Sequence, residues 1–179
     1  MHLAMWSGPR NLSTALMYSF AARGDCAVWD EPFYAAYLAA TGVDHPMRDE
    51  VTAAGECDPQ KVARACIGPI PGDAPLFYEK HMTLHMIPAF DRSFMRKCVN
   101  VFLIRHPARV VASYSRQRAS VTLDDIGFTQ QAELFDEVAA FKGQPPLVVD
   151  SSDIRADPAG VLARLCAAVG IEYTERMTR

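Results

Sequence analysis

Residues 5–16, MWSGPRNLSTAL, decide the expected fold near the start of the chain. An apolar run ends at Trp6, a turn follows, and a helical pattern led by Ser13 and Thr14 comes next. Backbone N–H groups at the start of such a helix are unpaired and carry partial positive charge, which favours a bound anion. The stretch therefore predicts a phosphate-holding strand–loop–helix unit, the alternative being a plain turn with a Ser/Thr helix cap.

Strands and helices alternate along the rest of the chain. Apolar runs predict five strands, at residues 2–6, 26–29, 76–79, 97–105 and 146–150. Helical patterns occupy residues 12–23, 32–41, 59–67, 107–116, 128–141 and 157–170, with short helical pieces at 82–95 and turn-rich loops at 42–58, 68–75 and 117–127. This alternation predicts an α/β three-layer sandwich with a central, mostly parallel five-stranded sheet.

Length and composition indicate one soluble domain over residues 1–179. Half of the residues are hydrophobic and 22% are charged, as in ordinary globular proteins. The polar end, GIEYTERMTR, leads us to expect that a C-terminal segment is lacking. No apolar run approaches the roughly 20 residues of a membrane span, and no leader-like segment precedes the first strand, so we expect a cytoplasmic protein.

Charge and cysteine usage narrow the class of ligand. A net charge of −3 argues against a nucleic-acid or anionic-membrane surface, although local arginines can still hold a small anion. The five cysteines are scattered and form no CxxC pair. We therefore expect reduced thiols, no disulfide framework and no metal site. Nothing in the sequence predicts an oligomeric state.

A second segment, LIRHPARVVASYSR at residues 103–116, repeats the strand–turn–helix arrangement. Arg105 ends the strand, Pro107 suits the first helical turn, and Ser113 follows on that helix. Ligands of open α/β sheets bind at the carboxyl ends of strands, so Arg105 and Ser113 are placed to bind one further phosphate. The alternative is a surface arginine and a serine that only fills space.

Together the two segments resemble the sulfotransferases that use 3′-phosphoadenosine 5′-phosphosulfate (PAPS), above all bacterial sulfotransferase-like proteins. The likeness extends through WDEPFYAAYL, FYEKHMTLHM, VTLDDIGF and VVDSSDI. It implies that Arg105 and Ser113 bind the 3′-phosphate. It also implies that the 5′-phosphosulfate is bound by the loop after the first strand, made of Ser7, Gly8, Pro9, Arg10, Asn11, Leu12, Ser13 and Thr14. Leu12 replaces a frequent glycine, RHP replaces the commoner RDP or RNP, and the family's adenine-contacting C-terminal loop has no match.

The implied reaction transfers a sulfuryl group to a hydroxyl or amine of a small-molecule or carbohydrate acceptor. Arg10 would neutralise charge on the leaving phosphate, as in phosphoryl transfer. The base would be Glu31, after the second strand, or His81, after the third, with Lys80 assisting and His85 as a weaker third candidate. Glu31 could instead cap the helix that Pro32 opens, and His81 could be a satisfied polar residue. The loops at 42–58 and 117–127 are placed to select the acceptor.

Two other functions remain open at this point. A P-loop kinase or hydrolase has a similar architecture, but the template G-x-x-x-x-G-K-[ST] requires Gly and Lys where this chain has Leu12 and Ser13. A magnesium-binding aspartate after an apolar strand is also missing, apart from Asp150 late in the chain. The second alternative is a non-catalytic member of the fold that binds a nucleotide.

Overall fold

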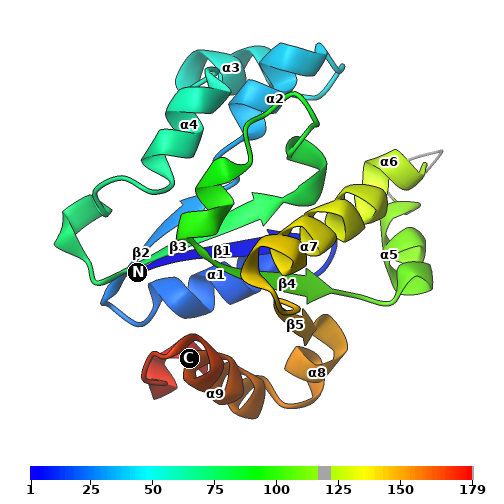
Figure 1. Ribbon diagram of the computed structural model, residues 1–179. Helices are drawn as coiled ribbons and strands as arrows, with labels where there is room; N and C mark the ends of the chain where they lie inside the picture. Colours follow the sequence, from blue (N-terminus) through cyan, green and yellow to red (C-terminus); the bar gives the residue numbers. More distant parts are fainter. Residues whose placement is uncertain (117–121, 179) are drawn as a thin grey trace.

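A single five-stranded sheet forms the centre of the protein. The computed structural model describes residues 1–116 and 122–178. All strand pairs are parallel, in the order β2-β3-β1-β4-β5 (Figure 1). The strands are β1 (His2–Ser7), β2 (Cys26–Asp30), β3 (Leu76–Met82), β4 (Val99–Ile104) and β5 (Leu147–Asp150). The expected α/β sandwich is confirmed, and the sheet is wholly rather than mostly parallel.

The helices connect the strands and cover both faces of the sheet. Their bounds are α1 (Ser13–Ala21), α2 (Tyr34–Thr41), α3 (Arg48–Ala54), α4 (Pro59–Ala65), α5 (Pro107–Tyr114), α6 (Leu123–Ile126), α7 (Phe128–Lys142), α8 (Ser151–Ala156) and α9 (Pro158–Val169). Short 3-10 helices are η1 (Pro71–Asp73), η2 (Thr83–His85), η3 (Ser93–Lys97) and η4 (Glu175–Thr178). No helix in the described ranges is long and apolar enough to cross a bilayer.

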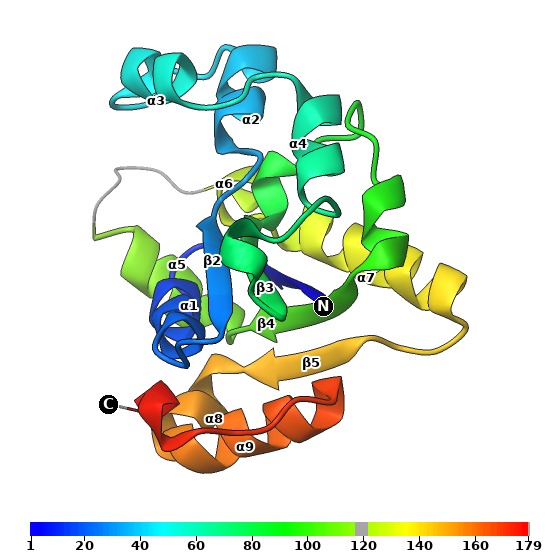
Figure 2. The same ribbon diagram turned by 90° about the vertical axis from the view of Figure 1, so that its left-hand side faces the viewer.

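Two apolar cores lie on opposite faces of the sheet. Successive strand residues point to opposite faces, so Leu3 and Met5 enter one core while Ala4 and Trp6 enter the other. The first core packs α1, α9 and η4 against the sheet, and the second packs α2, α4, η3 and α7. Figure 2 shows α8 and α9 on one side of the sheet and α4 and α7 on the other. Burial on both faces explains why β1 is almost continuously apolar.

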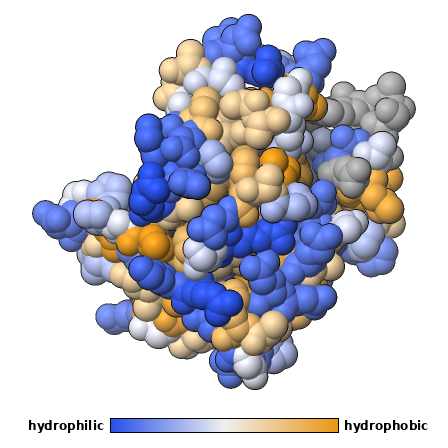
Figure 3. All heavy atoms as spheres, turned by 45° about the horizontal axis from the view of Figure 1, so that its top comes forward, coloured by the Kyte–Doolittle hydropathy of each residue, from blue (hydrophilic) through white to orange (hydrophobic). Residues whose placement is uncertain are grey.

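The strand register aligns the carboxyl ends of the three central strands. Ser7 at the end of β1 pairs with Met82 of β3 and with Leu103 of β4. The segments that follow β1 and β4 therefore leave the sheet side by side. On the face of the molecule seen in Figure 3, hydrophilic residues are interspersed with smaller hydrophobic areas.

Several local expectations are corrected by the structure. The stretch 42–58, expected to be a loop, contains α3, whose first turn holds Asp49 and Glu50. Acidic residues there favour a helix through its dipole. Helix α8 also lies where none was expected. Strand β3 continues to Met82, so Lys80 and His81 lie within the strand and not after it. Polar residues are possible there because both side chains are buried next to polar partners.

Candidate active site

The loop between β1 and α1 has an unusual backbone. Arg10 and Leu12 both adopt positive φ angles, 64° and 66°, although neither is glycine. Each such residue costs about 1 kcal/mol or more, and this kind of strain concentrates at functional sites. Leu12 is the N-cap of α1 and no side chain caps the helix. The alternative interpretation, a plain turn with a Ser/Thr cap, is therefore not supported, because Ser13 and Thr14 are already helical.

Three residues of the predicted phosphate loop hold its shape through internal contacts. Asn11 is buried, and its Nδ2 donates to the Leu103 carbonyl at 3.2 Å, which ties the loop to the end of β4. The buried Ser7 hydroxyl donates to the Gly8 carbonyl at 2.7 Å. A Cβ at Gly8 would lie 2.7 Å from the Ile126 carbonyl oxygen, so the close approach that requires this glycine is to α6. Asn11, Ser7 and Gly8 thus shape the loop.

The structure brings the two predicted phosphate segments together. Arg10 Nε donates to the Ser113 hydroxyl at 3.0 Å, and Arg105 Nη1 donates to the Arg10 carbonyl at 2.6 Å. Arg105 follows β4 directly, and Ser113 lies on α5. The aligned carboxyl ends of β1 and β4 produce this contact.

These residues line one cavity of about 700 Å³, which we call the anion cavity. None of the described residues that line it is acidic. Burial, followed by the charges of Arg155, Arg109 and Arg10, lowers the pKa of Arg105. A cavity with several guanidinium groups at the N-terminus of a helix is suited to a multiply charged anion. Its lining residues are Arg10, Asn11, Leu12, Ser13, Thr14, Ala15, Arg105, Arg109, Ala112, Ser113, Arg116 and Arg155.

A second cavity has a volume of about 370 Å³, and we call it the acceptor cavity after the acceptor that the sequence leads us to expect. Pro9 and Tyr114 line this cavity, while the adjacent residues Arg10 and Ser113 line the anion cavity. The same two segments, 9–10 and 113–114, therefore contribute lining residues to both cavities. The described residues that line the acceptor cavity are Pro9, Glu31, Tyr34, Tyr37, Val43, Asp44, His45, Met82, Leu84, His85, Tyr114 and Asp125.

Glu31 reaches the acceptor cavity from the end of β2 and is held by Lys80. The buried Lys80 Nζ lies 2.7 Å from Glu31 Oε1 and 2.6 Å from Asp30 Oδ1. Burial alone would lower the pKa of Lys80, but Glu31 and Asp30 outweigh burial and raise it. Lys80 is therefore a permanent cation. Glu31 also has a positive φ, 51°, and its N–H donates to the Lys80 carbonyl at 2.8 Å.

His85 lies in the wall of the acceptor cavity as a neutral imidazole. Its ring stacks between Tyr34 and Tyr37, with both centroid distances 4.9 Å. Burial, then the charges of Lys80, His45 and His81, lowers its pKa to about 3. Its Nδ1 atom is buried and has no hydrogen-bond partner among the residues that the structure describes.

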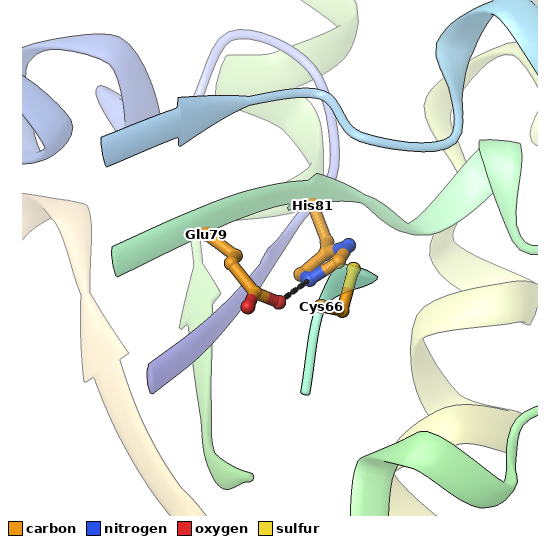
Figure 4. A group of neighbouring side chains, drawn as sticks. All are labelled: Cys66, Glu79 and His81. Carbon is orange, nitrogen blue, oxygen red and sulfur yellow. Dashed lines mark hydrogen bonds and ion pairs between the residues drawn. The ribbon is translucent and has the colours of Figure 1, made fainter. Parts of the chain in front are cut away.

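His81, the other predicted base, lies apart from these residues. It is 2% exposed, stacks on Trp6 at 4.4 Å between centroids, and its Nε2 lies 3.0 Å from Glu79 Oε2 (Figure 4). It lines neither cavity. Strand alternation explains this position, because Lys80 and His81 point to opposite faces of β3. Of the two predicted bases, only Glu31 lines the acceptor cavity.

Sequence reasoning missed Arg155 and the aromatic wall of the acceptor cavity. Arg155 lies on α8, a helix that the pattern did not predict, and it enters the anion cavity only because α8 follows β5 directly. Tyr34 and Tyr37 lie one helical turn apart on α2. This spacing indicates that they share one face of the helix, but it does not show that this face lines a cavity.

Comparison with known proteins adds an independent line of evidence. The sulfotransferase domain family model matches residues 1–179. The sulfotransferase domain of the Synechococcus PCC 7002 olefin synthase shares the fold, with a TM-score of 0.55 and 16% identity, over 98% of this chain and 75% of that one. The sulfotransferase domain from the curacin biosynthetic pathway gives a TM-score of 0.53 and 14% identity, over 98% and 76%.

Two curated plant proteins are more similar in sequence. Branched-chain-amino-acid aminotransferase-like proteins 2 and 1 of Arabidopsis thaliana are each 34% identical over 174 residues, which is 97% of this chain. The chain spans 31% of the length of each. Since the family model covers the whole chain and the fold agrees with it, this protein belongs to the sulfotransferase domain family.

Proposed function

We propose that the protein transfers a sulfuryl group from PAPS to a hydroxyl or amine group of a small-molecule or carbohydrate acceptor. The observation that carries this proposal is the pair of contacts that join Arg10 to Ser113 and Arg105 to the Arg10 carbonyl. These contacts join the two segments into one site. A nucleotide with phosphates on both the 5′ and the 3′ side of its ribose requires such a site.

The residues of the anion cavity fit such a nucleotide. The uncapped N-terminus of α1, with Ser13 and Thr14, would bind the 5′-phosphosulfate, and Arg10 would neutralise the charge that grows on the leaving phosphate. Arg105 and Ser113 would bind the 3′-phosphate with charge-assisted hydrogen bonds. Burial, and after it repulsion from the neighbouring guanidinium groups, lowers the pKa of Arg105, and a bound anion would relieve that repulsion.

Glu31 is the residue placed to accept a proton from the acceptor. It lines the acceptor cavity, its side chain is 27% exposed, and Lys80 Nζ lies 2.7 Å from its Oε1 atom. The acceptor oxygen or nitrogen would form a bond to sulfur as the bond between sulfur and the 5′-phosphate oxygen breaks. The acceptor proton would pass to Glu31. Lys80 would orient Glu31, because two carboxylates already hold its ammonium group.

Calorimetric titration with adenosine 3′,5′-bisphosphate, adenosine 5′-monophosphate and ATP–magnesium tests the donor. We expect the bisphosphate to bind most tightly, and Arg105→Ala to remove that preference. Arg164→Ala is the matched control, since Arg164 is exposed on α9 and does not line the anion cavity. Equal binding of the mono- and bisphosphate would overturn the proposed donor.

Radiolabelled sulfuryl transfer from PAPS to a panel of alcohols, amines and sugars then tests the reaction. Transfer that is lost in Glu31→Gln, with bisphosphate binding retained, is the expected result. A preference for ATP–magnesium would instead favour a kinase-like function, and tight bisphosphate binding without transfer to any acceptor would favour a non-catalytic nucleotide-binding protein.

A further inference from the structure

The second core contains a group of side chains that neither cavity uses. Cys66 is the C-cap residue of α4, and Glu79 and His81 lie two residues apart on β3, so both point to the same face of the sheet. The ligand atoms of these three side chains all lie within 4.8 Å of one another, and all three residues are buried. Figure 4 shows the sulfur of Cys66 beside the imidazole and the carboxylate.

The carboxylate of Glu79 is incompletely satisfied. Its residue is 0% exposed, and Oε2 has the His81 Nε2 contact at 3.0 Å. Oε1 is buried without a hydrogen-bond partner among the described residues, and the His2 Nδ1 atom lies 3.7 Å from it, beyond hydrogen-bond distance. A buried charge in apolar surroundings is costly unless it is paired or coordinates a metal.

We propose that Cys66, Glu79 and His81 bind a divalent transition-metal ion of the zinc type in the protein core. Zn²⁺ takes thiolate, imidazole and carboxylate ligands, usually in a tetrahedron, and three protein ligands leave one position for a small ligand such as water. Thiolate, carboxylate and a neutral imidazole around a divalent ion form a group of zero net charge. Such a group suits the apolar core between Trp6 and α4.

Coordination would require small shifts of these side chains: His81 Nε2 and Glu79 Oε2, now 3.0 Å apart, would separate slightly, and ligand atoms up to 4.8 Å apart would draw closer. Zinc bonds of about 2.0–2.3 Å in a tetrahedron place the ligand atoms about 3.3–3.8 Å apart. The ion would join α4 to β3 at the two residues that flank Lys80. Cys66, Glu79 and His81 line neither cavity, so the proposal does not depend on sulfuryl transfer.

Titration of the chelator-treated, reduced protein with Co²⁺ tests the site directly. One equivalent is expected to produce a near-ultraviolet thiolate-to-cobalt absorption band and strong visible bands, which Zn²⁺ then displaces. At a hundredfold excess of Zn²⁺ over the dissociation constant, the unfolding midpoint should rise by about 5–10 °C. Absence of a stoichiometric band and of any stabilisation in the wild-type protein would overturn the proposal.

Variants assign the band to these ligands. Cys66→Ala should remove the thiolate band, and Glu79→Gln should weaken Co²⁺ binding at least tenfold. Cys166→Ala is the control for loss of a buried thiol, because Cys166 lies in the other core. Cys57→Ser is the control for a more exposed thiol. A band that survives Cys66→Ala and disappears in Cys57→Ser would place the metal at Cys57 and refute the proposed site. If a core variant does not fold, the titration of the wild-type protein still tests the proposal.

Discussion

Arg10 and Ser113 are joined by a 3.0 Å hydrogen bond, although 103 residues separate them in the chain. The bond links the loop after β1 to the helix after β4, and Arg105 closes the connection by donating to the Arg10 carbonyl. Because the same side chains line the anion cavity, a ligand there would contact both segments at once. Loss of either segment should therefore weaken binding at the other.

Ser113→Ala is expected to weaken adenosine 3′,5′-bisphosphate binding about 5- to 20-fold. The variant removes one hydroxyl contact to a charged group and frees Arg10 from its anchor. Arg105→Ala should cost more, about 10- to 150-fold, because a permanent charge is lost as well. Isothermal titration of both variants checks this order. Ser115→Ala, just beyond the end of α5, is the control, and an equal loss there would contradict the assignment.

Glu31→Gln is expected to reduce kcat for sulfuryl transfer by about 10²–10⁴-fold with little change in bisphosphate affinity. The amide keeps the shape of the side chain but cannot accept the acceptor proton. Steady-state kinetics together with calorimetry separate these two effects. Asp30→Asn is the matched control, because Asp30 also contacts Lys80 but does not line the acceptor cavity. If Asp30→Asn lost as much activity as Glu31→Gln, the shared role of the two carboxylates would be to hold Lys80, and Glu31 would not be the base.

His85 should make stability depend on pH in the acid range. Its pKa is about 3 in the folded protein against an ordinary value of 6.5, so between these values the unfolded chain binds the extra proton. This contribution to stability is complete above pH 6.5 and falls by about 1.4 kcal/mol per pH unit as the pH decreases towards 3. Urea unfolding at several pH values measures the slope.

The variant His85→Phe keeps the stack with Tyr34 and Tyr37 but cannot titrate. Its unfolding free energy should depend less steeply on pH between 6.5 and 4.5 than that of the wild type. Identical slopes in the two proteins would show that His85 does not carry the pH dependence.

Gly8→Ala is expected to destabilise the fold by about 1–3 kcal/mol. The added Cβ would lie 2.7 Å from the Ile126 carbonyl oxygen, a backbone atom that cannot move without shifting α6. Chemical denaturation measures the loss. Because α6 also borders the acceptor cavity through Asp125, we expect KM for the acceptor to rise as well. Unchanged stability would show that the loop can accommodate a Cβ at position 8, contrary to this prediction.

Much of this site could be anticipated from the sequence because parallel sheets follow simple rules. Apolar runs that alternate with helical patterns predict parallel strands, and residues such as Arg10 and Arg105, which follow strands, then gather at one edge. The order of strands was not predictable in this way. It depends on which helices pack on which face, and only that order places β4 beside β1.

The errors have physical causes as well. The apolar run stops at Tyr78, so His81 was expected to follow the strand. Strand β3 in fact continues through polar residues that are buried with their hydrogen-bond or ion-pair partners. Because side chains alternate along a strand, His81 then points into the core. Arg155 was missed because α8 is too short to show periodicity. The proximity of Cys66 to Glu79 depends on how α4 docks, and no local spacing encodes that contact.

The anion cavity and the acceptor cavity are lined by consecutive residues at Pro9–Arg10 and Ser113–Tyr114, yet most of their other lining residues come from different parts of the chain. Much of the acceptor wall comes from the stretch between β2 and α3, which contributes nothing to the arginine cluster. Under the proposed function, replacing that stretch should therefore change which acceptor is used and leave the groups that would bind the nucleotide in place.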